Sequence, residues 1–333
     1  MIMAGKKRRF SSILLIAVLT GMVLGLTASG QRRSGNNGGE DPLTGGQGAR
    51  GGVKTVTIPI TIREREKTSP QELMPVGDFI VREDGDVQRI LSVRSISNAP
   101  LSVAILIQDD VVPSIGNDIK ALKEFVSRLP RGSRVMVGYI RSGSLQVLQK
   151  FTVDLERASQ ALRIPIGSAS AAPYNPYVEI REGLKRFESL PAGRRAMLVV
   201  SDGLDVSRGA DSSQPGQSID LDRAIKEAQR NSVAIYSFYA PTVTLAASGN
   251  RLLTSNALGS LQMLSDETGG RAFFQGTGAP VSFDPFLREL GLSFTRQMAI
   301  TYLSTHPKKG YHRIEVKSDS PNLEIDHPAG YTR

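Results

Sequence analysis

The chain has 333 residues, of which 40% are hydrophobic, and it contains no cysteine. This length is sufficient for a full buried core, and the lack of cysteine excludes disulfides, zinc–cysteine clusters and thiol nucleophiles. The formal charge of +9 does not indicate nucleic-acid binding, because the Lys and Arg residues are scattered except near the start of the chain.

The first 30 residues have the pattern of an export signal. Residues 6–9 (KKRR) are basic, residues 10–26 form an uncharged apolar run, and residues 27–30 supply small side chains where a signal peptidase can cut. The run of about 17 residues is also close to a minimal membrane span, so an uncleaved N-terminal anchor is the alternative. Both interpretations predict that the rest of the chain is exported: periplasmic, in the cell envelope or secreted. Membrane contact is expected only through this segment, if it is uncleaved.

A flexible linker is predicted over residues 31–52, which are dominated by Gly, Asn, Ser, Arg and Gln. Residues 53–98 are interpreted as an N-terminal β segment, with β-branched residues at 53–63 and a short strand and hairpin turn within 78–89. The Asp84–Gly85 pair in that turn lacks the spaced oxygen ligands of a calcium loop, so turn chemistry explains it.

An α/β domain is predicted over residues 99–296. Residues 101–107 and 195–201 are nearly continuous apolar runs, typical of central strands that are buried on both faces. Further strands are expected at 133–140, 145–151 and 233–239, and helices at 115–129, 154–162, 177–190, 221–230 and 258–268. This alternation predicts a doubly wound, mostly parallel, Rossmann-like sheet with helices on both faces.

The tail, residues 297–333, differs from this pattern. Strands are expected at 298–304 and 311–317, joined through residues 306–310. They are predicted to pair with the N-terminal β segment as a small β appendage.

Acidic residues follow both central strands. The first strand leads into Gln108, Asp109 and Asp110, and the second leads into Asp202 and Asp205. In an open parallel sheet, ligands gather beyond the carboxyl ends of the strands. A ligand site is therefore expected at these two strand ends.

Several segments, in their order and spacing, resemble the von Willebrand factor A domain, and within it the exported variety abundant in acidobacteria. The resemblance covers residues 53–333, and it rests on residues 78–85 with Gln88, residues 100–107, residues 199–203 and the closing Gly330 and Tyr331. It implies the α/β fold described above and a binding or adhesion function.

The resemblance also implies a metal site, which this sequence has altered. In the family, a D-x-S-x-S loop, a Thr and a later Asp coordinate Mg²⁺ or Mn²⁺, and an open metal position accepts a partner's carboxylate. The alignment puts Gln108 at the Asp, Asp110 and Val112 at the two Ser, and Ala171 or its neighbour Ser170 at the Thr. Only Asp202 matches, so the metal-ion-dependent adhesion site is interpreted as degenerate.

Two hypotheses describe such a loop. In the first, a weak Mg²⁺ or Ca²⁺ site is rebuilt from Asp109 or Asp110 together with Asp202 and Asp205. In the second, these carboxylates only form turn and helix-cap hydrogen bonds, without an ion. The second is preferred, and no cofactor is expected.

The predicted function is non-enzymatic binding of another protein, or adhesion, through the loops that follow the central strands. The alternatives are a structural scaffold role in an envelope assembly and, as a minor hypothesis, metal-dependent hydrolysis. No catalytic residue is assigned, because His306, His312 and His327 all lie in the tail, where surface or strand positions explain them. The site candidates are Asp110 and Asp202 for a metal, and Gln108, Asp109, Ser170, Tyr174 and Asp205 for the ligand face.

Overall fold

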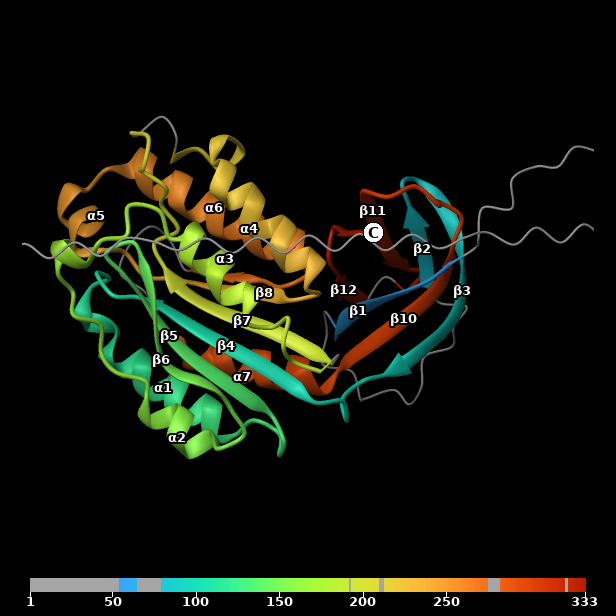
Figure 1. The fold of residues 1–333 in the computed structure, drawn as a ribbon, viewed down its shortest axis with the longest axis horizontal. Helices are drawn as coiled ribbons and strands as arrows, with labels where there is room; N and C mark the ends of the chain where they lie inside the picture. The colour runs from blue at the N-terminus through green and yellow to red at the C-terminus, as the bar shows by residue number, and fades with distance from the viewer. Residues whose placement is uncertain (1–53, 65–78, 192, 210–212, 275–281, 321–322) are drawn as a thin grey trace, which may run out of the picture. The chain divides into compact units, whose positions relative to one another are not determined.

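The computed structural model describes residues 54–64, 79–191, 193–209, 213–274, 282–320 and 323–333. The export signal and the linker predicted over residues 1–52 lie outside the described residues. Within the described residues, which belong to one unit of the chain, the strands form a parallel-rich sheet of six strands and an antiparallel sheet of seven (Figure 1).

The parallel-rich sheet has the strand order β6-β5-β4-β7-β8-β9. All of its neighbouring strands are parallel except β5 and β6, which form an antiparallel pair. Its strands are β4 (Leu101–Gln108), β5 (Arg134–Arg141), β6 (Ser144–Thr152), β7 (Arg194–Ser201), β8 (Ala234–Tyr239) and β9 (Ala272–Phe273). Every residue of β4 is buried, as expected for a central strand covered on both faces.

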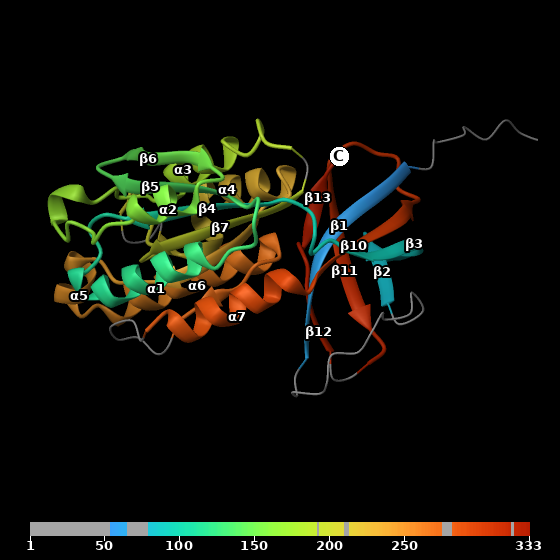
Figure 2. The ribbon, with the colours of Figure 1, turned by 90° about the horizontal axis from the view of Figure 1, so that it is seen from below.

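Helices cover both faces of this sheet, so the mixed α/β class follows the alternation in the sequence (Figure 1). One face packs against α1 (Gly116–Ser127), α2 (Leu155–Gln160) and α7 (Asp284–Thr295), and α1 and α7 run side by side (Figure 2). The other face packs against α3 (Tyr177–Lys185), α4 (Ile219–Arg230) and α6 (Arg251–Thr268). The short helix α5 (Val243–Ser248) follows β8.

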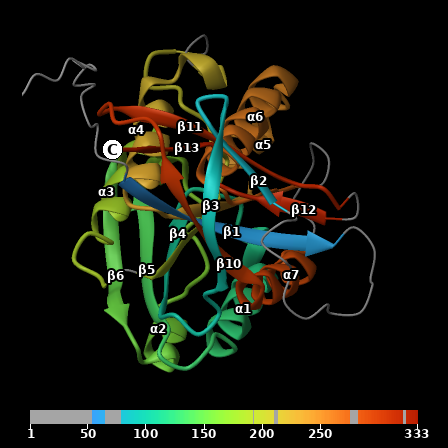
Figure 3. The same ribbon diagram turned by 90° about the vertical axis from the view of Figure 1, so that its right-hand side faces the viewer.

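The antiparallel sheet interleaves strands from both ends of the described chain, in the order β12-β1-β10-β3-β2-β11-β13 (Figure 3). Its strands are β1 (Lys54–Glu64), β2 (Phe79–Glu83), β3 (Asp86–Ser95), β10 (Gln297–Ser304), β11 (Tyr311–Ser318), β12 (Leu323–Asp326) and β13 (Gly330–Thr332). Apolar side chains from β1, β2, β10 and β11 form its own core. The turn between β2 and β3 has positive φ at Asp84 and Gly85, as a two-residue hairpin requires.

Two helices were not expected from the sequence. Helix α7 repeats apolar residues at Leu287, Leu290 and Phe294, a helical spacing, and has Pro285 in its first turn. Helix α5 has only six residues, too few for a periodic pattern to stand out. In addition, α6 begins seven residues before the expected 258, because Asn250 caps it by accepting hydrogen bonds from the backbone of Leu252 and Leu253.

Candidate functional site

The loop after β4 is fixed by backbone hydrogen bonds to the loop after β8. Val112 N donates to Pro241 O at 2.9 Å, and Val243 N donates to Asp110 O at 3.0 Å. Val111 and Thr242 form an isolated antiparallel bridge between these two contacts. The predicted site residues therefore lie on a rigid backbone at the carboxyl ends of β4, β7 and β8.

Gln108 ends β4 and presents an amide to two carboxyl groups. Ser201 Oγ donates to Gln108 Oε1 at 2.5 Å, and the same hydroxyl accepts from Gly203 N at 2.9 Å. Because the amide oxygen is occupied, the donating –NH₂ is the group left for Asp110 and Asp202. Hydrogen bonding by the Gln108 side chain lowers the pKa of both carboxyls, against the stronger effect of their burial.

Asp202 and Asp110 form a buried acid pair. Burial raises the pKa of Asp202 to about 7, the charge of Asp110 adds to this, and hydrogen bonds from Leu204 N and Thr242 oppose it. Burial also raises the pKa of Asp110, together with the charge of Asp109. Asp110 Oδ1 has no hydrogen-bond partner among the described residues. Asp110 is only 2% exposed and Asp202 only 4%, so solvent barely reaches them.

Asp109 points away from this pair and is held by Arg163. The guanidinium of Arg163 binds both carboxylate oxygens, at 2.7 and 2.8 Å, and Ile166 N donates to Oδ1 at 3.1 Å. The same guanidinium lies 4.0 Å from the centre of the Tyr139 ring. Asp109 is fully buried, so it fastens the segment after α2 to the end of β4 and does not face a ligand.

Asp205 is also a structural residue. It is buried, and its carboxylate accepts from Ser207 Oγ at 2.6 Å and from Ser218 Oγ at 2.7 Å. It therefore joins the loop after β7 to the residue that caps α4, and it does not belong to the ligand face.

Ser170 and Tyr174 are exposed. Ser170 lies in a short 3-10 turn, Ala169–Ala171, and shares a hydrogen bond of 2.9 Å with Ser168. Tyr174 is 68% exposed and has a left-handed φ of 60°, which is rare for an aromatic residue. Its carbonyl accepts from Val206 N at 2.9 Å, so its backbone is fixed to the loop after β7.

Exposed apolar side chains accompany Tyr174 on this side of the sheet. Ile164 is 54% exposed and Ile166 is 45% exposed, and both lie in the segment that Asp109 fastens. We call the solvent-facing part of the loops at residues 109–115, 163–176, 202–209 and 240–242 the strand-end face. The buried side chains of Asp109, Asp110, Asp202 and Asp205 lie beneath it. The strand-end face combines fixed loops with apolar side chains turned to solvent.

The residues aligned with the family's metal ligands offer few oxygen atoms to a metal ion. Asp110 and Asp202 offer carboxylate oxygens, whereas the Gln108 carbonyl is already bound to Ser201. Val112 and Ala171 have no side-chain donor. Two nearly inaccessible carboxylates fall short of the octahedral oxygen shell that Mg²⁺ demands.

Three residues that sequence reasoning missed are central to this arrangement: Arg163, Ser201 and Thr242. Arg163 lies between Leu162 and Ile164, and an Arg in an apolar stretch is a signal that it has a buried partner. Ser201 and Thr242 carry no comparable signal, because hydroxyl residues are common at strand ends and helix caps.

Among the helices of the described residues, none combines the length and the apolar character needed to cross a bilayer. No protein-family model matches this sequence, and no curated protein matches it either.

Several solved structures are similar to this chain. The conserved hypothetical protein BatB of Bacteroides thetaiotaomicron is 12% identical, with a TM-score of 0.39 over 59% of this chain and 97% of that one. An aerotolerance-related membrane protein of Bacteroides fragilis is 13% identical, with a TM-score of 0.39 over 58% and 98%. A von Willebrand factor type A protein of Catenulispora acidiphila is 11% identical, with a TM-score of 0.43 over 83% and 74%. At such low identity and TM-score, function has to be inferred from the residues of this chain.

Proposed function

We propose that this chain is a non-enzymatic binding protein that holds a protein partner on its strand-end face without a metal ion. The observation that carries the proposal is the exposure of Tyr174, Ile164 and Ile166 on loops whose backbone is fixed by hydrogen bonds to Asp109 and to Val206. Exposed apolar and aromatic side chains on a rigid backbone supply contact area at a small entropic cost.

A metal ion is not needed for this binding. In the family that the sequence resembles, the ion attracts a partner's carboxylate, whereas here the Gln108 amide donates toward the two remaining carboxyls. A neutral donor shared by two acids partly offsets the cost of their burial. We therefore propose that the acid pair supports the loops from inside and leaves contact with the partner to the exposed side chains.

Catalysis is disfavoured by the same geometry. Raised carboxyl pKa values are typical of active sites, but here the largest cause is burial, and a substrate cannot reach side chains so little exposed. The three histidines of the chain, His306, His312 and His327, belong to another part of the sequence. We propose that the acid pair has no general acid or base role.

Site-specific photo-crosslinking of the full-length chain in its native cells tests the binding proposal. A photoreactive amino acid at Tyr174 is expected to capture one defined protein. The matched control is the same substitution at Tyr311, another exposed tyrosine, which lies on the antiparallel sheet. Capture at both positions, or at Tyr311 alone, would contradict a partner site on the strand-end face.

The affinity of the captured partner then measures the contribution of Tyr174. We expect Tyr174→Ala to weaken binding by about 30-fold, the effect of losing one aromatic hot spot, and Tyr311→Ala to leave binding unchanged. Equal affinities for the two variants would favour a scaffold role that does not use this face.

Titration calorimetry with Mg²⁺ and Ca²⁺ tests the metal-free part of the proposal. We expect no saturable heat from the wild-type chain, and the same result from Asp202→Ala. Saturable binding that this substitution abolishes would restore a metal site to the strand end.

We also propose that the protein acts outside the cytoplasm, on the strength of the basic and apolar segments in residues 6–26. Cell fractionation with N-terminal sequencing tests this directly. A cleaved chain in the periplasm or medium, or an uncleaved chain in the membrane fraction, agrees with the proposal, and a cytoplasmic chain with an intact N-terminus does not.

A further inference from the structure

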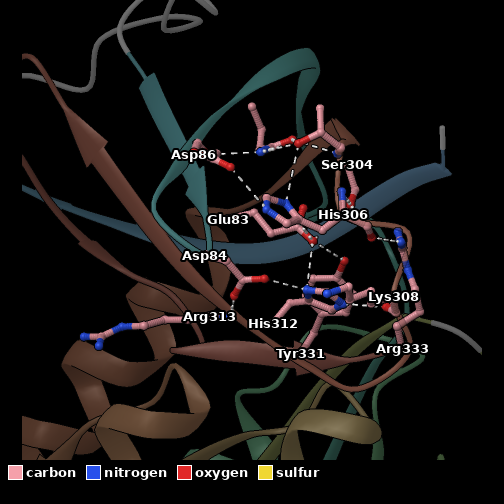
Figure 4. Close-up of polar contacts among 12 residues, drawn as sticks. Glu83, Asp84, Asp86, Ser304, His306, Lys308, His312, Arg313, Tyr331 and Arg333 are labelled. Carbon is pink, nitrogen blue, oxygen red and sulfur yellow. Dashed lines mark hydrogen bonds and ion pairs between the residues drawn. The ribbon is translucent and has the colours of Figure 1, made fainter. Parts of the chain in front are cut away.

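A mixed cluster of imidazoles and carboxylates lies on the antiparallel sheet (Figure 4). The β2–β3 hairpin contributes Glu83, Asp84 and Asp86, and the chain from the end of β10 into β11 contributes His306 and His312. The register of β2 with β11, in which Glu83 faces Ile314, brings these distant segments together.

The polar atoms of the cluster converge. One ligand atom from each of Glu83, Asp84 and His306 lies within 4.8 Å of the others. His312 Nδ1 is 2.7 Å from Asp84 Oδ2 and 3.5 Å from Glu83 Oε1, and His306 Nδ1 is 4.0 Å from that same Glu83 oxygen. Figure 4 shows the carboxylates directed toward the two imidazole rings.

The hydrogen bond made by Nε2 of His312 determines what the other ring nitrogen, Nδ1, can bind. His312 Nε2 lies 2.8 Å from Lys308 O, and because a carbonyl only accepts, Nε2 carries a proton. In the neutral ring, Nδ1 then turns a lone pair toward two carboxylates. The lone pair and the negatively charged carboxylate oxygens repel each other. A cation at Nδ1, either a proton or a metal ion, removes this repulsion. A ligating histidine whose other nitrogen donates to a backbone carbonyl is the usual arrangement at protein metal sites.

Glu83 supplies an independent observation. Its side chain is fully buried, and Oε1 accepts from Tyr331 at 2.9 Å and from Ser304 at 3.0 Å. Oε2 has no hydrogen-bond partner among the described residues, although it is buried as well. An unpaired buried carboxylate oxygen is costly, and the other oxygen of the same carboxylate, Oε1, is the one that lies near the two imidazoles. The Glu83 carboxylate therefore has capacity left for a ligand at this cluster.

We propose that Glu83, Asp84, His306 and His312 bind one divalent transition-metal ion of the Zn²⁺ class. Two imidazoles with two carboxylates suit Zn²⁺, whereas Mg²⁺ and Ca²⁺ prefer oxygen ligands alone. This site is separate from the strand-end face and does not depend on the function proposed above.

Binding requires the side chains to move, because the described ligand atoms that all lie within 4.8 Å of one another come from Glu83, Asp84 and His306, and His312 has to join them. Two ligands of a tetrahedral ion with bonds of about 2.0 Å lie about 3.3 Å apart, so the contact of 2.7 Å between Asp84 and His312 has to open slightly. The ion can enter past His306 and Asp86, whose side chains are 25% and 75% exposed. Once bound, it links the β2–β3 hairpin to β11 and stabilises the sheet.

The test is calorimetric titration of the full-length chain, free of any histidine tag, with Zn²⁺ at pH 7.5. We expect saturable binding of one ion, weakened at least about tenfold by His306→Gln and by Asp84→Asn. Both substitutions are mild, because His306 is partly exposed and asparagine tolerates the left-handed φ of 51° at Asp84. His327→Gln is the matched control, since His327 lies outside the cluster and its Nε2 accepts from Val316 N.

Thermal unfolding gives a second readout and shows whether each variant is folded. Saturating Zn²⁺ should raise the Tm of the wild type and of His327→Gln by about 5 °C, and should leave the Tm of His306→Gln nearly unchanged. Absence of saturable Zn²⁺ binding to the wild type, or binding by His306→Gln and Asp84→Asn that is as tight as that of the wild type, would overturn the proposal. The cluster would then be an ion-pair network in which a protonated His312 is the cation.

Discussion

Replacing Asp202 by Asn should stabilise the folded chain at neutral and alkaline pH. The pKa of Asp202 is raised from 3.8 to about 7, mainly by burial. At about 1.4 kcal/mol per pKa unit, keeping this group ionised reduces the free energy of unfolding by up to about 4 kcal/mol at pH 8. An asparagine in its place carries no charge, and its carbonyl can still accept from Leu204 N.

The pH dependence follows from the direction of this shift. Because the pKa of Asp202 in the folded chain lies above that in the unfolded chain, folding favours the protonated acid. The free energy of unfolding of the wild type is therefore reduced least below pH 3.8. The loss in the free energy of unfolding grows as the pH rises from 3.8 to about 7 and is constant above that. The advantage of Asp202→Asn should therefore be small near pH 4 and largest at pH 8.

Urea unfolding of both proteins at pH 5, 6, 7 and 8 in the presence of EDTA measures this difference. Subtracting the free energy of unfolding of the wild type from that of the variant cancels the titrating groups that do not interact with Asp202. A variant that is less stable than wild type at pH 8, or a difference that does not change with pH, would refute the reasoning. Destabilisation seen only when Mg²⁺ replaces EDTA would instead reveal an ion at the acid pair.

Three further predictions concern the loops of the strand-end face. Arg163→Ala should lower the free energy of unfolding by about 3–5 kcal/mol, because it removes the guanidinium that binds both oxygens of the buried Asp109 carboxylate and leaves only Ile166 N and the more distant Arg141. Arg163→Lys should recover only part of this, since an ammonium cannot bind both oxygens at once. Gly203→Ala should destabilise by about 2–3 kcal/mol in urea titrations, because φ is +71° and the new Cβ would lie 2.5 Å from Leu261 Cγ. Tyr174→Gly should change stability by no more than about 1 kcal/mol and still weaken the affinity for the captured partner by about 30-fold, and a large loss of stability would assign Tyr174 a structural role instead.

The sequence predicts the parallel-rich sheet well because its central strands are buried on both faces. Such strands have few polar positions, so residues 101–107 and 195–201 stand out as nearly continuous apolar runs. Gly269 likewise marks the end of α6, because its φ of +78° favours glycine. Short elements such as α5 lack this kind of signal.

The side-chain partners in the two sites could not be predicted in the same way. Asp109 and Arg163 are 54 residues apart, and Asp84 and His312 are 228 residues apart. Local periodicity describes which face of an element is buried, but only the three-dimensional pairing of elements decides which charges meet. The three histidines were interpreted as surface or strand positions, and it is the register of β2 with β11 that turns two of them toward acids.

The order of strands in the antiparallel sheet has a consequence for how the protein folds. Strand β10 lies between β1 and β3, although more than two hundred residues separate it from both along the chain. Pairings between residues so distant form slowly, whereas the α/β segment between them can fold through more local contacts. We therefore expect β1, and the edge of β3 that faces away from β2, to stay unpaired, with Ile58 and Ile60 uncovered, until the last strands have been synthesised. A chain truncated before Gln297 loses the strand that joins them, so it should aggregate as well as lack its tail.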